Sequence, residues 1–191
     1  MRKLVTDHLL SLDGYCGGPN GEINWFTFDE ESQEWSRNLL RAAGAVVMGR
    51  RTYELLMQYW PTPQAMKNEP VITERLATLP KFVFSHTLKS STWENSHFVQ
   101  RPPNQVIKEM KQEKGGHILV IGSPTLLAEF WKQQLVDELN IRVQPIVVGK
   151  GLPLFPVSET RQNLALKECH RFQSGVSALR YEVVTDVMKK S

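Results

Sequence analysis

The chain has 191 residues, of which 41% are apolar and 23% charged, and its formal net charge is +3. This composition can fill one hydrophobic core, so we expect a single domain over 1–191. The basic residues are scattered, which argues against a nucleic-acid partner, and no apolar run approaches the roughly 20 residues that cross a bilayer. Without a signal-peptide pattern or a CxxC pair, the sequence favours a cytoplasmic protein.

Residues 3–12 predict a first strand, which Asp13-Gly14 stops. Glycines and a proline crowd residues 14–21, so we expect a turn-rich loop there and consider it a candidate for mobility. Loops of this kind can close over an active site.

A helix is predicted over 29–43, because Thr27 followed by Glu30 has the spacing of a capping box. Gly44 is the expected end of this helix. Its expected inner stripe consists of Trp35, Leu39, Ala42 and Ala43.

Short apolar runs then alternate with helical segments, which is typical of buried parallel strands joined by helices. The expected strands are 45–48, 81–84 and 117–121, and the expected helices are 50–58, 103–113 and 124–134. In the last helix, Ser123 is the expected N-cap and Pro124 the first helical residue.

The alternation of strands and helices stops after residue 134. Strands are predicted over 136–148, 163–173 and 176–187, with little room for helices between them. Alternating strands and helices followed by a closing set of strands predict an α/β fold. We expect a central mixed, mostly parallel sheet that ends in an antiparallel C-terminal ribbon.

Polar or glycine-rich turns follow three of the short strands, and ligands of open α/β sheets bind outside the carboxyl ends of the strands. Two of these turns are glycines that lead into a helix start, which is an anion-binding arrangement. Arginine guanidinium groups and hydroxyls add donors that suit phosphate oxygens. The candidate phosphate-binding residues are Gly49, Arg50, Arg51 and Thr52, then Ser85, His86 and Thr87, and finally Gly122, Ser123, Pro124 and Thr125.

Each of these corners also has a purely structural explanation. Strand–glycine–helix turns are common, and Ser85-His86-Thr87 has the composition of an ordinary turn. Arg50 and Arg51 suit a solvated first helical turn, although cations at a helix start oppose the macrodipole. That local conflict favours a functional reason for the pair.

The stretches SLDGY, MGRRTYE, KFVFSHTL, VIGSPTLLAEF and LVDELNIRVQPIVVGKGLPLF, together with Trp25, resemble the dihydrofolate-reductase-like superfamily in order and spacing. Within it, the chain is most similar to the RibD C-terminal domain family, the reductase domain of the riboflavin-pathway deaminase–reductase, in a stand-alone form. The resemblance implies a three-layer α/β/α fold, NADPH as the cofactor and a homodimer. It also implies that the three corners above contact the cofactor phosphates.

The sequence departs from this family at the third corner, where Ile121 stands in place of the usual glutamate. The deaminase domain with its zinc ligands has no counterpart in this sequence, and the five histidines are scattered without metal-site spacing. We therefore expect no metal. The helix carboxylate of classical dihydrofolate reductases cannot be matched to one residue among Asp29, Glu30, Glu31 and Glu34.

Reduction of a C=N or C=C bond needs a hydride from the nicotinamide and a proton. Asp13 is the candidate catalytic and substrate-binding residue, with a turn-forming Asp-Gly as the alternative. Tyr15 and Trp25 are candidates for stacking on a flat substrate ring, with core packing as the alternative.

The function predicted from these residues and the resemblance is that of an NADPH-dependent reductase. It would resemble 5-amino-6-(5-phosphoribosylamino)uracil reductase and act on a pyrimidine-, pteridine- or ribosylamine-like compound. The alternatives are a dihydrofolate reductase proper and a non-catalytic nucleotide-binding or regulatory protein of the same fold. FMN is an alternative occupant of the phosphate corners.

Overall fold

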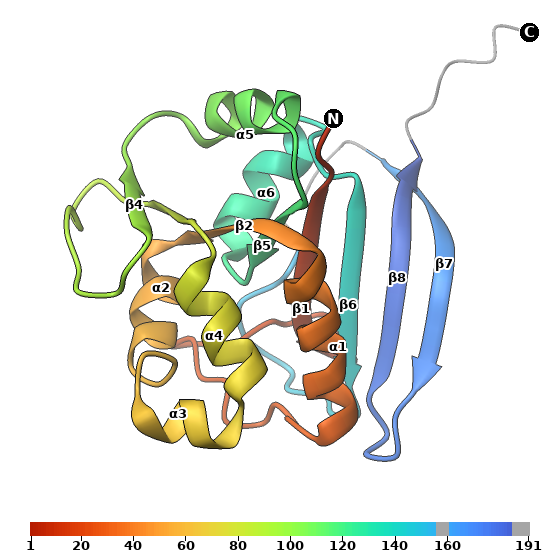
Figure 1. Ribbon diagram of the computed structural model, residues 1–191. Coiled ribbons are helices and arrows are strands. Elements are labelled where there is room, and N and C mark those ends of the chain that lie inside the picture. The colour runs from red at the N-terminus through yellow and green to blue at the C-terminus, as the bar shows by residue number, and fades with distance from the viewer. Residues whose placement is uncertain (156–160, 185–191) are drawn as a thin grey trace, which may run out of the picture.

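An eight-stranded sheet in the order β4-β3-β2-β5-β1-β6-β8-β7 forms the centre of the computed structural model, which describes residues 1–155 and 161–184 (Figure 1). The strands from β4 to β6 are parallel to their neighbours, whereas β8 is antiparallel to both β6 and β7. The strands are β1 (Leu4–Ser11), β2 (Ala43–Gly49), β3 (Lys81–Phe84), β4 (Ser96–Val99), β5 (His117–Ile121), β6 (Glu138–Gln144), β7 (Asn163–Arg171) and β8 (Ser177–Val184).

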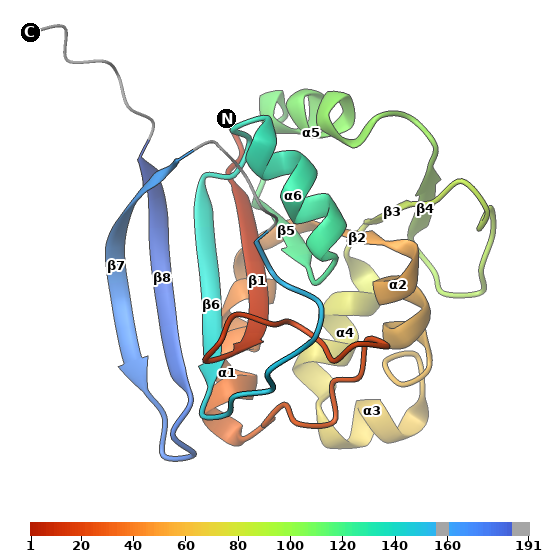
Figure 2. The ribbon, with the colours of Figure 1, turned by 180° about the vertical axis from the view of Figure 1, so that it is seen from behind.

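Helices cover both faces of the parallel part of this sheet, which gives three layers (Figures 1 and 2). None of the described helices is long and apolar enough to cross a membrane. The helices are α1 (Glu30–Ala42), α2 (Arg50–Met57), α3 (Pro63–Asn68), α4 (Pro70–Thr78), α5 (Pro103–Gln112) and α6 (Pro124–Lys132).

Two buried clusters hold the layers together, because successive strand residues point to opposite faces. Val46 and Met48 of β2 pack with α1, α2 and α4, whereas Ala45 and Val47 pack with α5 and α6. Residues 45–48 of β2 and 118–121 of β5 are therefore apolar without interruption, as expected for strands covered on both faces. The predicted fold class is confirmed.

Several details of the prediction around α1 are wrong. The N-cap is Asp29, whose carboxylate accepts from the Ser32 N–H at 2.7 Å, and not Thr27. The helix ends at Ala42, which is exposed rather than on the inner stripe, and Gly44 lies inside β2 at a register shift. An added Cβ on Gly44 would stand 2.8 Å from the Gly116 N, so this glycine allows two strand starts to approach rather than ending a helix.

Three elements between residues 63 and 99 were not predicted, namely α3, α4 and β4. Pro63 belongs to a run that ends the preceding helix, yet Pro63 and Pro70 each stand in the first turn of a helix, where a missing N–H costs nothing. The predicted strand 136–148 ends earlier, at Gln144, and residues 185–187 of the predicted strand 176–187 lie outside the described residues.

Candidate functional site

The three polar corners predicted from the sequence lie at one edge of the sheet. They follow β3, β2 and β5, which are adjacent and parallel, so their carboxyl ends point the same way. Gly49 at the end of β2 is in register with Phe84 at the end of β3. Sheet topology thus brings together residues that lie far apart in the sequence.

The corners after β2 and β5 are locked to each other through one hydroxyl. Ser123 Oγ accepts a hydrogen bond from the Gly49 N–H at 2.6 Å and lies 2.9 Å from Thr52 Oγ1. An added Cβ on Gly49 would stand 2.9 Å from Ser123 Oγ, so glycine is needed for this close approach. Ser123 precedes the first residue of α6, as predicted, but its side chain makes no cap hydrogen bond to that helix.

This contact between the corners also requires an unusual backbone conformation at the corner after β5. Gly122 and Ser123 both have positive φ, at 57° and 58°. A non-glycine residue in this region is uncommon, and the two hydrogen-bonding contacts of the buried Ser123 hydroxyl hold it there. Ser123 is therefore a positioning residue that sets the helix starts of α2 and α6 side by side.

Positive charge at this edge is not offset by local carboxylates in the first helical turns. Neither α2 nor α6 has an acidic residue in its first turn, and Gly49 has no side chain to cap α2. Arg50 is paired with Glu54 at 2.8 Å, whereas Arg51 is exposed and has no partner among the described residues. Two uncapped helix starts and a free guanidinium suit an anion.

The corner after β3 consists of one buried residue, Ser85, and two exposed residues, His86 and Thr87. Ser85 is buried, and its hydroxyl accepts from the N–H groups of Thr87 and Leu88 at 3.2 and 2.8 Å. The side chains of His86 and Thr87 are exposed. Ser85 thus shapes the turn, and the following two residues have side chains that a ligand can reach.

Asp13 lies on the loop after β1 and binds backbone rather than projecting freely. Its carboxylate accepts from the N–H groups of Val148 and Gly149 at 3.2 and 2.8 Å. The Ser11 hydroxyl and these two amides hold the pKa of Asp13 below its ordinary value. A carboxyl that is ionised at neutral pH accepts hydrogen bonds and does not donate a proton, so the geometry favours the turn-forming alternative for this residue.

The glycine-rich loop that contains Tyr15 is paired with a second loop. The N–H of Cys16 donates to Leu152 O and the N–H of Leu152 donates to Gly17 O, both at 2.8 Å. An added Cβ on Gly151 would stand 2.2 Å from Gly17 O, so these backbones touch. A closing motion of the loop would have to break this pairing.

The two aromatic candidates are half-buried and lie on connecting segments. Tyr15 forms an isolated bridge with Pro153, and Trp25 packs edge to face on Phe26 with ring centroids 4.3 Å apart. The N–H of Thr27 donates to Gln144 Oε1 at the end of β6, which is separated from β2 in the sheet by β5 and β1. Neither ring belongs to a buried cluster of the described residues, so these contacts do not select core packing over stacking on a substrate.

A buried ion pair beneath α1 was not predicted. Arg142 of β6 binds Asp7 of β1 at 2.7 Å and also donates to the main-chain and side-chain oxygens of Ser32 at 2.8 Å. Burial raises the pKa of Asp7, against the opposite effect of Arg142. The available signal was a charged residue inside each of two predicted strands, with Arg142 between Ile141 and Val143.

The described residues contain no group of three or more His, Cys, Asp and Glu side chains placed to hold a metal ion. His8 is buried in β1, and burial lowers its pKa to about 3. Its ring is therefore neutral across the physiological range.

Comparisons with known proteins give consistent results. The family model of the RibD C-terminal domain matches residues 2–178. The uncharacterized protein YyaP of Bacillus subtilis is 28% identical over 180 residues, which cover 94% of each chain. A putative riboflavin biosynthesis protein from Shewanella sp. PV-4 has a similar structure, with a TM-score of 0.76, 21% identity and coverage of 96% of this chain and 99% of that one.

A pyrimidine reductase-like protein from Corynebacterium diphtheriae also has this fold, with a TM-score of 0.67 and 16% identity. The alignment covers 97% of this chain and 93% of that one. The structural likenesses at these identities concern the fold.

Proposed function

Because this chain belongs to the RibD C-terminal domain family, we propose that it is an NADPH-dependent reductase of a pyrimidine-, pteridine- or ribosylamine-like compound. Hydride passes from the nicotinamide of NADPH to a carbon of a C=N or C=C bond, and a proton adds to the other atom of that bond. The products are the reduced compound and NADP⁺. The cofactor supplies the hydride, and the protein orients it.

The adjacency of the three corners at one sheet edge carries this proposal. The helix starts of α2 and α6 bind the pyrophosphate, and Thr125 lies in the first turn of α6 with an exposed side chain. Arg51, His86 and Thr87 bind the 2′-phosphate. A donor-rich edge without acidic residues in either first helical turn suits a polyanion better than a neutral ligand.

A second function, that of a nucleotide-binding protein without turnover, is favoured by one observation. Neither position considered for an acidic group can donate a proton: Ile121, where the family usually has glutamate, is a hydrocarbon side chain, and Asp13 is held ionised. Such a protein would bind NADPH at the same corners and would not oxidise it.

Titration and turnover assays separate these functions. We expect saturable quenching or enhancement of NADPH fluorescence, together with loss of the nicotinamide absorbance when pteridines and riboflavin-pathway intermediates are added in turn. Binding without oxidation by any compound supports the non-catalytic function. The absence of saturation at millimolar NADPH, with well-folded protein, contradicts both. Inhibition of turnover by an antifolate favours a dihydrofolate reductase.

A further inference from the structure

A cavity of about 230 Å³ lies beside α1, away from the edge that carries the three corners. Its walls come from the second half of α1 and from the strands β5, β6, β7 and β8. His117 and Glu138 line it, and these are the first residues of β5 and β6. The cavity thus lies toward the amino ends of these parallel strands, where α1 ends (Figure 1).

The floor of this cavity has two acceptors with incomplete hydrogen bonding. Asn140 is fully buried, and its Oδ1 has no partner among the described residues. Its Nδ2 is 3.4 Å from Glu138 Oε1, a weak hydrogen bond. Glu138 is 16% exposed, and its nearest cation is Lys3 Nζ at 4.0 Å. A buried carbonyl without a donor is costly, so the floor calls for N–H or O–H groups.

The remaining charges on the cavity wall balance each other. Glu168 is hydrogen-bonded to both Arg180 and His170. Glu138, by contrast, has only a long contact at 4.0 Å to the half-exposed Lys3, so its charge is the least compensated of those that line the cavity and favours a cation.

The α1 side of the cavity is largely apolar. Leu39 and Ala42 line it together with the indole of Trp35, whose ring contacts His170 edge to face. The Trp35 Nε1 is buried without an acceptor, which leaves it for a water or for an acceptor atom of a ligand. A flat or short apolar body would lie against this wall.

We propose that this cavity binds a small organic cation whose flat amidinium or guanidinium group donates to Glu138 and Asn140. Its planar fork of N–H groups satisfies the carboxylate and the orphan carbonyl together, while its apolar part packs on Leu39 and Ala42. The volume corresponds to about eight waters at liquid density, so the ligand is small. The site is separate from the proposed cofactor edge.

Benzamidine and benzamide test the proposal, because they have nearly the same shape and differ in charge. We expect saturable shifts of one indole N–H signal in nitrogen–proton NMR spectra with millimolar benzamidine, and much weaker shifts with benzamide. The signal is assigned to Trp35 by its loss in Trp35→Phe. Glu138→Gln, which keeps the shape, weakens benzamidine about tenfold or more, whereas Glu74→Gln on the exposed side of α4 does not.

Equal binding of benzamidine and benzamide, or unchanged affinity in Glu138→Gln, would overturn the proposal, as would an unmoved Trp35 signal. Asn140→Asp provides a second check, since an added carboxylate at the floor should tighten benzamidine. NADPH titrations of Glu138→Gln keep the two sites apart. We expect NADPH to bind Glu138→Gln as it binds the wild type, whether or not benzamidine binds. A loss of NADPH affinity in Glu138→Gln would link this cavity to the cofactor edge.

Discussion

Two neighbouring arginines at the start of α2 have different surroundings, and they are expected to differ in function. Arg50 makes two hydrogen bonds to Glu54 at 2.8 and 2.9 Å, so the carboxylate of Glu54 partly neutralises its charge. Arg51 is exposed and has no partner among the described residues. The second arginine of the pair is thus the better phosphate ligand.

Arg51→Ala should weaken NADPH binding roughly 10–100-fold, because a charge-assisted hydrogen bond contributes about 1.5–3 kcal/mol. Arg50→Ala should have a smaller effect, and Arg171→Ala on the exposed face of β7 none. Fluorescence titration measures all three. If NADH binding falls as much as NADPH binding, Arg51 contacts the pyrophosphate instead of the 2′-phosphate. An affinity unchanged in both arginine variants would remove this corner from the cofactor site.

Asp13 illustrates how a candidate acid can be an anchor. Asp13→Asn loses an acceptor for the N–H groups of Val148 and Gly149, and so should loosen the two loops. The pKa of Asp13 lies below its ordinary value of 3.8 in the folded protein. Its contribution to stability is therefore present above that value and is lost as the pH falls through the lower folded pKa.

For a reductase with this anchor, the pH profile of kcat/KM should show no titration of Asp13 near neutrality. Steady-state rates of the wild type and Asp13→Asn between pH 5 and about 9 test this, since both profiles should have one shape. A basic limb that vanishes in the variant would identify Asp13 as the proton donor after all.

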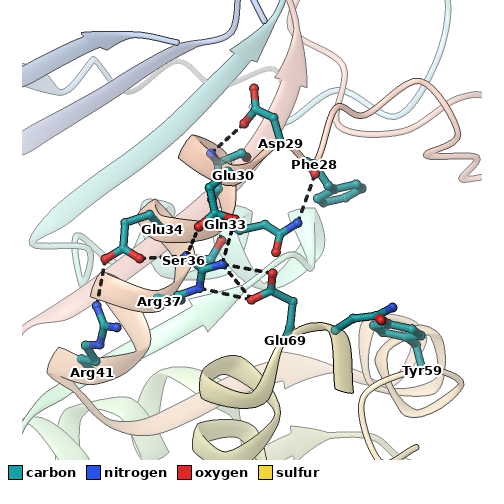
Figure 3. Close-up of polar contacts among 12 residues, drawn as sticks. Phe28, Asp29, Glu30, Gln33, Glu34, Ser36, Arg37, Arg41, Tyr59 and Glu69 are labelled. Atoms are coloured by element: carbon teal, nitrogen blue, oxygen red, sulfur yellow. Dashed lines mark hydrogen bonds and ion pairs between the residues drawn. The ribbon is translucent and has the colours of Figure 1, made fainter. Parts of the chain in front are cut away.

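At the scale of elements, a cluster of charges joins α1 to the junction of α3 and α4 (Figure 3). Arg37 donates to Glu30 and Glu34 on its own helix at 2.7 and 2.9 Å, and to Glu69 at 3.0 Å. Glu69 lies between α3 and α4 and is buried. The three carboxylates raise the pKa of Arg37, which stays charged.

Arg37→Gln should lower the free energy of unfolding by about 2–3 kcal/mol, because hydrogen bonds to charged groups are lost and Glu69 remains buried. Arg41→Gln is the control. Its pair with Glu34 is half exposed and should contribute less than about 1 kcal/mol. Urea unfolding of the three proteins measures both differences.

The difference in the free energy of unfolding between the wild type and Arg37→Gln should depend on pH. Hydrogen bonds from Arg37 hold the pKa values of Glu30 and Glu34 below 4.5. Their stabilisation is complete above 4.5 and disappears as the pH falls through the lower folded values. The gap between wild type and Arg37→Gln should therefore narrow in acid, and a constant gap would show that the glutamates do not take part.

The ion pair between β1 and β6 makes a second prediction at this scale. Arg142→Met leaves Asp7 buried without its partner and should cost about 3–5 kcal/mol. The double variant Asp7→Leu/Arg142→Met removes both charges and should be more stable than the single variant. Thermal unfolding that ranks the double variant lowest would show that the pair is a net stabiliser.

The comparison of sequence with structure depends on which forces set each element. Buried strands such as 81–84 and 117–121 were predicted with their observed bounds, since a short apolar run between turn residues is a local signal. The interlock of Gly49 with Ser123 could not be foreseen, because it depends on which strands become neighbours. The three corners follow the predicted strand ends, but the orientation of the Ser123 side chain depends on residues more than 70 positions away.

At the scale of the molecule, the C-terminal ribbon of β7 and β8 has two unlike faces and extends beside the helix-covered part of the sheet (Figures 1 and 2). Leu166 pairs with Tyr181 and Leu164 with Val183 on one face. Leu164 is 37% exposed and Leu166 54%. The opposite face is charged and includes Arg180 and Glu168, because the register shift between Leu166 and Glu168 pairs Glu168 with Arg180 and turns it away from the leucines.

We propose that the apolar face of the ribbon joins two copies into the homodimer expected from the family. Leu166→Glu should then give monomers, whereas Ala165→Glu on the opposite face should leave the dimer intact. Sedimentation velocity distinguishes the two states. A wild type that sediments as a monomer at all concentrations, or equal effects of both variants, would contradict this assembly.

The two edge strands of the sheet, β4 and β7, are compatible with this face-to-face dimer but disfavour pairing with strands of further molecules. β4 is only four residues long, and β7 has a register shift between Leu166 and Glu168. Lys167, His170 and Arg171 place further polar groups along that outer strand. A strand of another molecule that paired with β7 would meet a bent and charged edge strand. Even concentrated solutions of this protein should therefore yield discrete particles rather than filaments.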